Sequence, residues 1–409
     1  MPIHTDNDAI QTLHRLSTDT GIPIKDARIR RSSSRFCLGV EHGDYNGTEL
    51  FGVGTDRFIW MAYTPRNDSR IQIFSGNFPG DGIIDFGFGD TPLPRSPDIS
   101  DTWARFIYGV DFILLQEGVR LQRGMDAVLI GNIPGGGMSR SASLTLNLLL
   151  SLLDCNGIEI EDRFKIVDMA QAVENDYIGS PCGQLDQIMI LFAQEGKGTH
   201  YNPRERTIEY IEQGEGTDFR LVSLDTGTVR PGLEKSTYSI RRAECEEFVS
   251  LLREKYQIEY LADIRDREKY DQIFSEYGKT HPGLCSRFKY IFEAQQRFYI
   301  MLEAWKEGDI PAVGTLFRED GFGLRDDYQI SGPELETMCD IARTVDGVYG
   351  ERMLGGGDKG ASGAICHPDA VATLENTVGR EFPKIHPPLK DKYAVHPLKA
   401  VDGITLLEK

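Results

Sequence analysis

The stretch GNIPGGGMSRSASLTLN, residues 131–147, places three consecutive glycines directly before a run of serines. Gly135, Gly136 and Gly137 allow positive φ angles and a close approach of the backbone to a ligand. An apolar stretch precedes this loop and a helical pattern follows it, so backbone N–H groups and the positive end of the helix dipole would converge on an anion. A glycine turn with a serine N-cap fits the same residues equally well. The loop is therefore a candidate phosphate cradle, although it lacks the lysine of the P-loop and the G-x-G-x-x-G of dinucleotide-binding folds.

A second cluster combines one cation with several hydrogen-bond acceptors. Arg35, Glu41, His42 and Asp44 lie within a span of ten residues. Carboxylates and imidazole can hold the hydroxyls of a sugar, and a guanidinium can stabilise negative charge that develops on an oxygen. The cluster predicts a site for a hydroxylated ligand, while a solvated loop would explain the same residues taken alone.

The segment VENDYIGSPCGQLDQ, residues 173–187, carries a third set of functional groups. It spaces Glu174 and Asp186 across a helix end and a glycine turn. One carboxylate could bind Mg²⁺ while the other accepts the proton of an attacking hydroxyl. A second glycine cluster, at residues 352–366, could close on a ligand from another domain or form a tight strand connection. Together these clusters supply the groups that phosphoryl transfer requires.

The pattern of apolar residues predicts the elements that position these groups. Residues 125–131 form a short buried strand that leads into the first glycine loop, and residues 139–155 form a helix that ends before Gly157. In TWARFIYGVDFILLQEG the large apolar residues recur every three or four positions, which predicts one buried helix face. The strands expected at 55–66 and 70–78 flank a turn-rich PRNDS, which indicates a hairpin.

The length and composition describe a globular protein of two domains. A chain of 409 residues is too long for one comfortable core, and its 40% hydrophobic and 26% charged residues lie in the usual range. The charged, turn-rich segment 202–218 is the expected boundary, which gives domains at 1–215 and 216–409. Whether the last strand returns to the first domain is left open.

The charge and the cysteines argue against several classes of protein. The net charge of −18, without a cluster of lysines and arginines, argues against a nucleic-acid groove. Seven scattered cysteines without a C-x-x-C pair indicate a reducing compartment rather than a disulfide framework or structural zinc. The chain begins without the pattern of a signal peptide, and its longest apolar run is too short to span a bilayer. We therefore expect a cytoplasmic protein with no membrane partner and no evident obligate protein partner.

These motifs resemble those of the GHMP small-molecule kinases, and in particular those of the galactokinases. RFCLGVEHGDYNG, residues 35–47, is similar to the first family signature, and PGGGMSRSAS, residues 134–143, is similar to the second. VENDYIGSPCGQLDQ, STYSIRRAECEE, YQISGPELETM and VYGERMLGGGDKGASGA resemble further galactokinase segments in the family order. The resemblance covers nearly the whole chain. It implies a two-domain α+β fold, with an N-terminal α/β domain, a C-terminal α+β (ferredoxin-like) domain and the active site between them.

The resemblance also implies a reaction, the ATP-dependent phosphorylation of galactose or a close hexose at the anomeric C1 hydroxyl, with Mg²⁺ as cofactor. It implies that Asp186 is the catalytic carboxylate and that Arg35 is its charge-stabilising partner. The implied sugar-binding residues are Glu41, His42, Asp44, Gly183 and Tyr238. The implied residues for the ATP phosphates are Gly135, Gly136, Gly137, Ser139, Arg140 and Ser141, and those for Mg²⁺ are Ser141 and Glu174.

The sequence departs from the family pattern mainly in its glycine loops. The first loop is one residue shorter between its proline and its serines, and Arg140 replaces the middle serine. Cys37 stands where galactokinases carry asparagine, and Asp358 and Lys359 replace the Phe-Gly of the last signature. A cation at a helix N-terminus opposes the dipole, so we expect Arg140 to face phosphate or an acidic neighbour.

Two other functions fit the sequence. One is a kinase for another sugar, such as galacturonate, arabinose or N-acetylgalactosamine. The opening Arg35-Phe36-Cys37 resembles plant galacturonate kinases, but those lack the glutamate that Glu41 supplies here. The other is a non-catalytic sugar sensor related to galactokinases, which the altered phosphate loop suggests. The intact set of sugar-side residues favours galactose phosphorylation over both.

Overall fold

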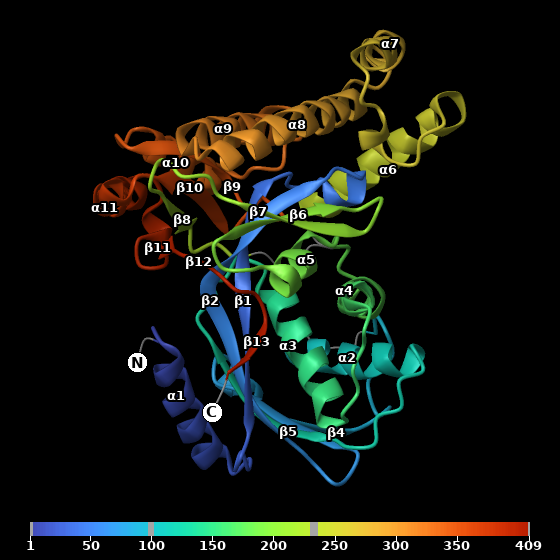
Figure 1. Ribbon diagram of the computed structural model, residues 1–409, viewed down its shortest axis with the longest axis vertical. Helices are drawn as coiled ribbons and strands as arrows, with labels where there is room; N and C mark the ends of the chain where they lie inside the picture. Colours follow the sequence, from blue (N-terminus) through green and yellow to red (C-terminus); the bar gives the residue numbers. More distant parts are fainter. Residues whose placement is uncertain (1–2, 97–101, 230–235, 408–409) are drawn as a thin grey trace.

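The computed structural model describes residues 3–96, 102–229 and 236–407 of the chain. Two long strands, β1 (Arg28–Gly39) and β2 (Leu50–Pro65), run from the lower half of the molecule into the upper half (Figure 1). The cavity described below is lined by residues between 35 and 186 together with residues between 228 and 360, so both of the predicted domains contribute to it, as the family resemblance implies.

The first sheet has nine strands in the described part of the chain. Its main path runs in the order β13-β1-β2-β5-β3-β4, with β12 and β6 added on β2 and β7 added on β6. The other strands are β3 (Arg70–Ser75), β4 (Ile83–Gly87), β5 (Met125–Gly131), β6 (Lys197–Asn202), β7 (Thr207–Glu212), β12 (Ala400–Val401) and β13 (Thr405–Leu407). Because β12 and β13 pair with β2 and β1, the end of the chain crosses back to the first sheet. The domain boundary near residue 215 stays a prediction.

The predicted hairpin between the strands at 55–66 and 70–78 is wrong. Strand β5 lies between β2 and β3, antiparallel to the former and parallel to the latter. β5 is apolar and almost wholly buried, so it occupies the centre of the sheet. Gly124 admits it, because a Cβ there would lie 1.7 Å from the carbonyl oxygen of Arg70. The turn residues predicted a change of direction correctly, but they carry no information about which strand fills the neighbouring place.

The second sheet is antiparallel and has the order β11-β8-β10-β9. Its strands are β8 (Arg220–Asp225), β9 (Val348–Met353), β10 (Ala361–Cys366) and β11 (Ala394–Leu398). Two sheets with helices packed on them agree with the predicted α+β class.

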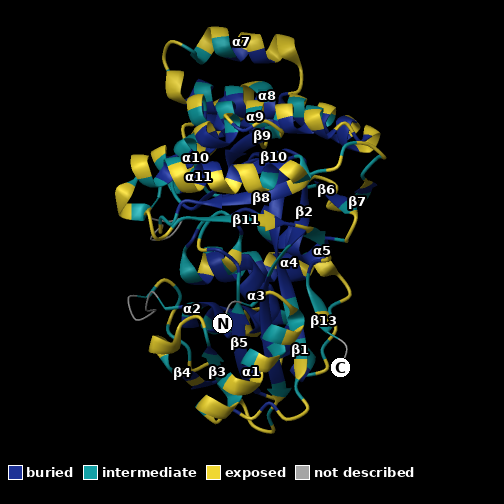
Figure 2. Cartoon of the chain, turned by 90° about the vertical axis from the view of Figure 1, so that its left-hand side faces the viewer, coloured by how far each residue is buried: buried dark blue, intermediate teal, exposed yellow. Residues whose placement is uncertain are grey.

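Helices cover both sheets. The helices between residues 6 and 192 are α1 (Asp6–Thr20), α2 (Ala104–Gln116), α3 (Arg140–Cys155), α4 (Arg163–Ala172) and α5 (Leu185–Phe192). The helices between residues 237 and 385 are α6 (Thr237–Tyr256), α7 (Arg267–Tyr277), α8 (Pro282–Glu307), α9 (Ile310–Asp326), α10 (Pro333–Arg343) and α11 (Val371–Ile385). Figure 2 shows that exposed residues gather on the outer helices while the strands beneath are buried.

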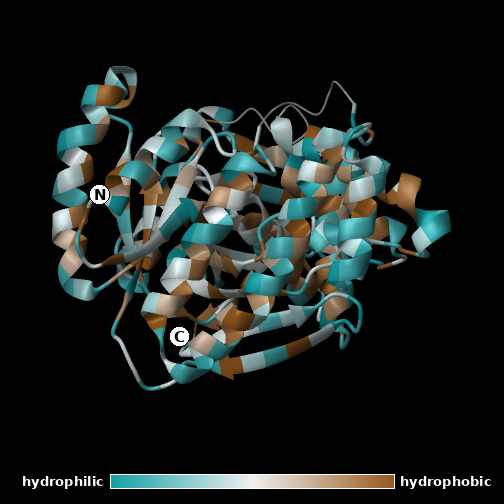
Figure 3. Ribbon diagram, turned by 90° about the horizontal axis from the view of Figure 1, so that it is seen from above, coloured by the Kyte–Doolittle hydropathy of each residue, from teal (hydrophilic) through white to brown (hydrophobic). Residues whose placement is uncertain are grey.

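Helices α2 and α3 confirm the patterns predicted from the sequence. All the apolar residues at helical spacing around α2 are buried, namely Trp103, Phe106, Ile107, Val110, Ile113 and Leu114. Helix α3 is buried along most of its length, and it begins at Arg140, one residue later than predicted. The outer helices alternate hydrophilic and hydrophobic positions (Figure 3). Among the described residues, no helix is both long enough and apolar enough to cross a membrane.

Candidate active site

A cavity of about 620 Å³ contains every site residue that the sequence predicts. Its lining includes Arg35, Glu41, His42, Asp44, Gly135, Gly136, Gly137, Ser139, Arg140, Ser141, Glu174, Gly183, Asp186 and Tyr238. These residues come from β1 and the turn that follows it, the first glycine loop, the N-termini of α3, α5 and α6, the turn Val173–Ile178 and the segment before α5. The fold therefore brings the three sequence clusters to one place.

Arg35 and Asp186 form an ion pair in the lining of the cavity. The Nε and Nη2 atoms of Arg35 each lie 2.8 Å from Oδ1 of Asp186, and its Nη1 donates to the carbonyl of Gly137 at 2.7 Å. The Arg35 side chain is 2% exposed, whereas that of Asp186 is 31% exposed. A buried cation thus fixes a carboxylate that remains open to the cavity and joins it to the glycine loop.

Two backbone N–H groups hold the carboxylate of Asp44 in place. The N–H of Leu185 donates to its Oδ2 at 3.2 Å, and the N–H of Tyr45 donates to its Oδ1 at 3.0 Å. Burial raises the pKa of Asp44, while these backbone bonds act in the opposite direction. Gly183 is required here, because a Cβ would lie 1.8 Å from Oδ2 of Asp44.

A group of rings surrounds His42. Its ring centroid lies 5.1 Å from those of Tyr238 and Tyr328, and its Nδ1 is 2.8 Å from the hydroxyl of Tyr45. The hydroxyls of Tyr45 and Tyr328 are 2.7 Å apart. The sequence prediction omitted Tyr45 and Tyr328, although both lie inside motifs that resemble the family segments. Among the described residues only His42 and Tyr238 of this group line the cavity, so Tyr45 and Tyr328 act from behind by holding the His42 ring in place.

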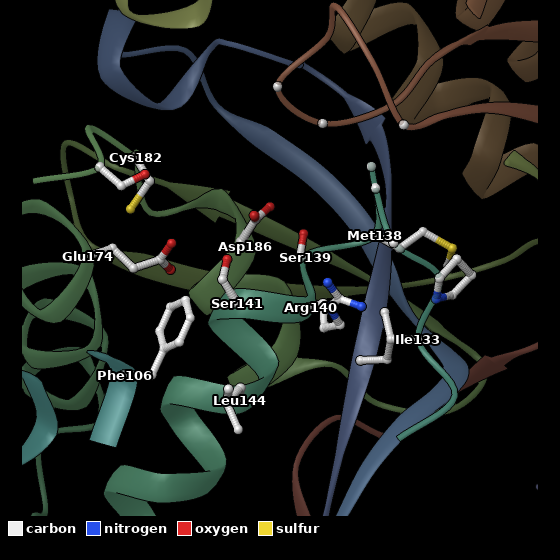
Figure 4. Close-up of a pocket in the computed structure, with 18 of the residues that line it drawn as sticks. Phe106, Ile133, Met138, Ser139, Arg140, Ser141, Leu144, Glu174, Cys182 and Asp186 are labelled. Carbon is white, nitrogen blue, oxygen red and sulfur yellow. The ribbon is translucent and has the colours of Figure 1, made fainter. Parts of the chain in front are cut away.

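The first glycine loop leads into α3 without a serine side-chain cap. Ser139, at the N-cap of α3, has a φ of 58° and makes no side-chain capping hydrogen bond. Its hydroxyl is buried and has no hydrogen-bond partner among the described residues. Ser139 and Ser141 lie at the start of α3, below Asp186 (Figure 4). The alternative in which Ser139 caps the helix is therefore wrong, and an unpaired hydroxyl remains for a ligand.

The two glycine loops touch each other. A Cβ on Gly136 would lie 2.4 Å from the Cα of Gly360, so only glycine fits. The N–H of Gly355, in the second loop, donates to Oε1 of Glu41 at 2.8 Å. Asp225, on β8, accepts a hydrogen bond from the N–H of Gly135. The second cluster of glycines therefore belongs to the site, where it links the first loop to the sugar-side residues.

Glu174 lies in a short π-helical turn, Val173–Ile178, and is 5% exposed. Burial, together with the charge of Asp186, raises its pKa to about 7, and the Ser141 hydroxyl opposes this rise. Its carboxylate points into the cavity near Ser141 (Figure 4). A bound cation would favour the ionised form. The described residues contain no cluster of three or more metal-binding side chains, but Mg²⁺ in phosphoryl-transfer sites takes one or two carboxylates and completes its shell with phosphates and water. Glu174 and Ser141 fit that pattern.

Arg140 lies on the rim of the cavity. It is solvent-exposed, and its guanidinium lies 5.6 Å from the ring centroid of Phe78. Partial desolvation lowers its pKa, and the charge of Asp225 acts in the opposite direction. Arg140 thus has the acidic neighbour expected for a cation at a helix N-terminus, and it also faces the space that the glycine loops surround.

Comparison with known proteins identifies the same family that the sequence motifs resemble. The family described as the N-terminal domain of GHMP kinases matches residues 106–194. The galactokinase of Limosilactobacillus fermentum is 30% identical over 352 residues, which cover 86% of this chain and 88% of that protein. The galactokinase of Enterococcus faecalis is 30% identical over 349 residues, which cover 85% and 88%.

Solved structures agree. The crystal structure of Lactococcus lactis galactokinase complexed with galactose superposes with a TM-score of 0.88 at 26% identity, covering 97% of this chain and 99% of that one. Methanococcus jannaschii mevalonate kinase shares the fold, with a TM-score of 0.64 at 14% identity over 93% of this chain and 100% of that one. With its motifs gathered in one cavity and its full-length similarity to these proteins, the chain belongs to the galactokinase family of GHMP kinases.

Proposed function

We propose that this protein transfers the γ-phosphoryl group of ATP to the anomeric C1 hydroxyl of galactose, giving galactose 1-phosphate and ADP. The observation that carries the proposal is the Arg35–Asp186 pair, which lies between the ring-lined sugar side and the glycine loops of one cavity. The relative in Lactococcus lactis was crystallised with galactose, which supports the choice of sugar.

Asp186 has the geometry of a proton acceptor for the sugar hydroxyl. Its carboxylate is open to the cavity, and Arg35 holds it at 2.8 Å. In the proposed mechanism Asp186 takes or orients the C1 hydroxyl proton as the oxygen attacks the γ-phosphorus, and the bond to the leaving ADP oxygen breaks. Arg35 then stabilises negative charge that develops on the transferred group.

The remaining residues bind the two substrates. Glu41, His42, Asp44, Gly183 and Tyr238 surround the proposed sugar subsite. Gly135, Gly136, Gly137, Ser139, Arg140 and Ser141 surround the proposed subsite for the ATP phosphates. Ser141 and Glu174 are the proposed holders of Mg²⁺, which would neutralise negative charge on the phosphates when bound. A cytoplasmic location and the lack of an obligate protein partner stay predictions.

A panel of free sugars tests the proposal. Galactose, galacturonate, arabinose and N-acetylgalactosamine are each incubated with the protein and MgATP, ADP release is measured, and the product is identified by ³¹P NMR. We expect turnover with galactose and a phosphate at C1. Turnover with one of the other sugars but not with galactose would mean that this other sugar is the substrate. Galactose binding measured by calorimetry, without turnover of any sugar, would favour a non-catalytic sugar sensor.

A further inference from the structure

Arg352 is a buried cation next to the sugar side of the cavity. It lies near the end of β9, immediately before the second glycine loop, and is 1% exposed. It is absent from the residues that line the cavity in the described part of the chain. Its guanidinium lies 4.5 Å from the ring centroid of Phe317, and its Nη2 donates to the carbonyl of Cys37 at 3.1 Å. A buried guanidinium stays charged, so its counter-charges must lie close by.

Two carboxylates supply the counter-charges. The Nη1 atom of Arg352 lies 3.8 Å from Oε1 of Glu41 and 3.7 Å from Oδ2 of Asp320. These distances exceed hydrogen-bond length, and Nε and Nη1 have no hydrogen-bond partner among the described residues. Arg352 therefore lies between the two carboxylates and is shared by them through charge.

Glu41 is the only one of these two carboxylates that lines the cavity, as far as the described residues show. The groups that face it are Arg35 and Cys37 on β1, Asp186 on α5, Tyr290 on α8, and Arg352 with the N–H of Gly355 from β9 and its loop. Burial raises the pKa of Glu41, whereas the charges of Arg35 and Arg352 act in the opposite direction. Arg35 forms its ion pair with Asp186, whereas Arg352 forms one with Glu41, at 3.8 Å, among the described residues.

We infer that Arg352 is a positioning residue for the sugar, which acts by holding the Glu41 carboxylate charged and directed into the cavity while Asp320 draws on the same guanidinium. This inference rests on the proposed function, because it assumes that Glu41 accepts a hydroxyl of the sugar. Arg352 itself does not touch the substrate. Asp320 weakens this effect of Arg352 on Glu41, because the two carboxylates compete for the charge of one guanidinium.

The test uses variants with opposite expected effects. Arg352→Gln removes the cation, so the KM for galactose should rise roughly tenfold with little change in the KM for ATP. The acid limb of kcat/KM for galactose should move to higher pH, by on the order of one unit, because Glu41 then protonates more easily. Arg352→Lys should recover part of the loss.

Asp320→Asn should move the same limb to lower pH, because it removes a negative charge and leaves the whole cation to Glu41. Arg343→Gln is the matched control, since Arg343 pairs with Glu351, the residue before Arg352, at 2.8 Å but has no contact with Glu41 or Asp320 among the described residues, so its acid limb should not move. If Arg352 had a purely structural role, Arg352→Gln would lower the stability of the protein, but the acid limbs of Arg352→Gln and Asp320→Asn would not shift in opposite directions.

The outcomes separate this inference from the proposed function. A wild-type protein that does not phosphorylate galactose contradicts the function, and the pH dependence of galactose binding by calorimetry then tests Arg352. An unchanged acid limb in Arg352→Gln overturns the inference. If that variant fails to fold, Asp320→Asn decides alone, because an unmoved or upward-shifted limb in it overturns the inference equally.

Discussion

The two sides of the cavity are built in different ways. On the sugar side, Glu41, His42 and Tyr238 are 3–6% exposed and are surrounded by other side chains. On the proposed phosphate side, two glycine loops form much of the lining, and Gly135 and Arg140 are exposed. A change on the sugar side would leave a buried partner unpaired, whereas a backbone N–H is present whatever side chain stands next to it.

This difference explains where the sequence follows the family pattern. The sugar-side residues match the galactokinase signatures, while the glycine loops carry the substitutions Arg140, Asp358 and Lys359. The structure gives Asp358 a role of its own, because its carboxylate accepts the N–H of Thr237 at 2.7 Å, next to Tyr238. The phosphate side can vary its side chains because its geometry depends on glycines, and some of that variation supports the sugar side.

The largest effect is expected at Asp186, where the two sides meet. Asp186→Asn removes the proton acceptor but keeps an oxygen for Arg35, so kcat should fall by about a thousandfold while galactose binding is largely retained. Asp176→Asn is the control, because Asp176 lies in the preceding turn and is exposed. Steady-state kinetics and calorimetry measure the two quantities. Loss of galactose binding together with turnover would show that Asp186 binds the sugar instead.

A smaller effect is expected on the sugar side, at Gly183. The Cβ of Gly183→Ala would displace Asp44, so the KM for galactose should rise by about tenfold or more while the KM for ATP is unchanged. Gly283→Ala is the matched control, because a Cβ at Gly283 meets no atom within 4 Å. Equal increases in the KM for galactose and the KM for ATP would contradict this prediction, because they would mean that the sugar side and the phosphate side do not act independently.

The sequence predicts the site better than it predicts the sheet. Arg35, Asp186 and the glycine loop were found because each carries a local pattern of residue types, and the fold brings them together. The order of β2, β5 and β3 could not be found in this way, because it depends on which strand is buried most deeply and on the absence of a Cβ at Gly124.

Residues that act through a neighbour were also missed. Asp225 and Arg352 come from the second sheet, and they reach the first glycine loop and Glu41 only after folding. Their positions in the sequence, far from the residues that they contact, give no signal of this. Ser139 shows the reverse case, since its type fits both an N-cap and a ligand group, and only its backbone angle and unpaired hydroxyl separate the two.

The smallest effect is expected on the phosphate side, at Arg140. We expect this exposed side chain to contact the ATP phosphates, which would compensate for the loop residue that the family has and this chain lacks. Arg140→Ser should therefore raise the KM for ATP by roughly three- to tenfold, leave the KM for galactose unchanged and weaken the dependence of the KM for ATP on salt. Arg120→Ser, an exposed arginine that does not line the cavity, is the control. An unchanged or lower KM for ATP in Arg140→Ser would mean that the glycine loops bind the phosphates without it, and that Arg140 is tolerated on the rim only because Asp225 is its neighbour.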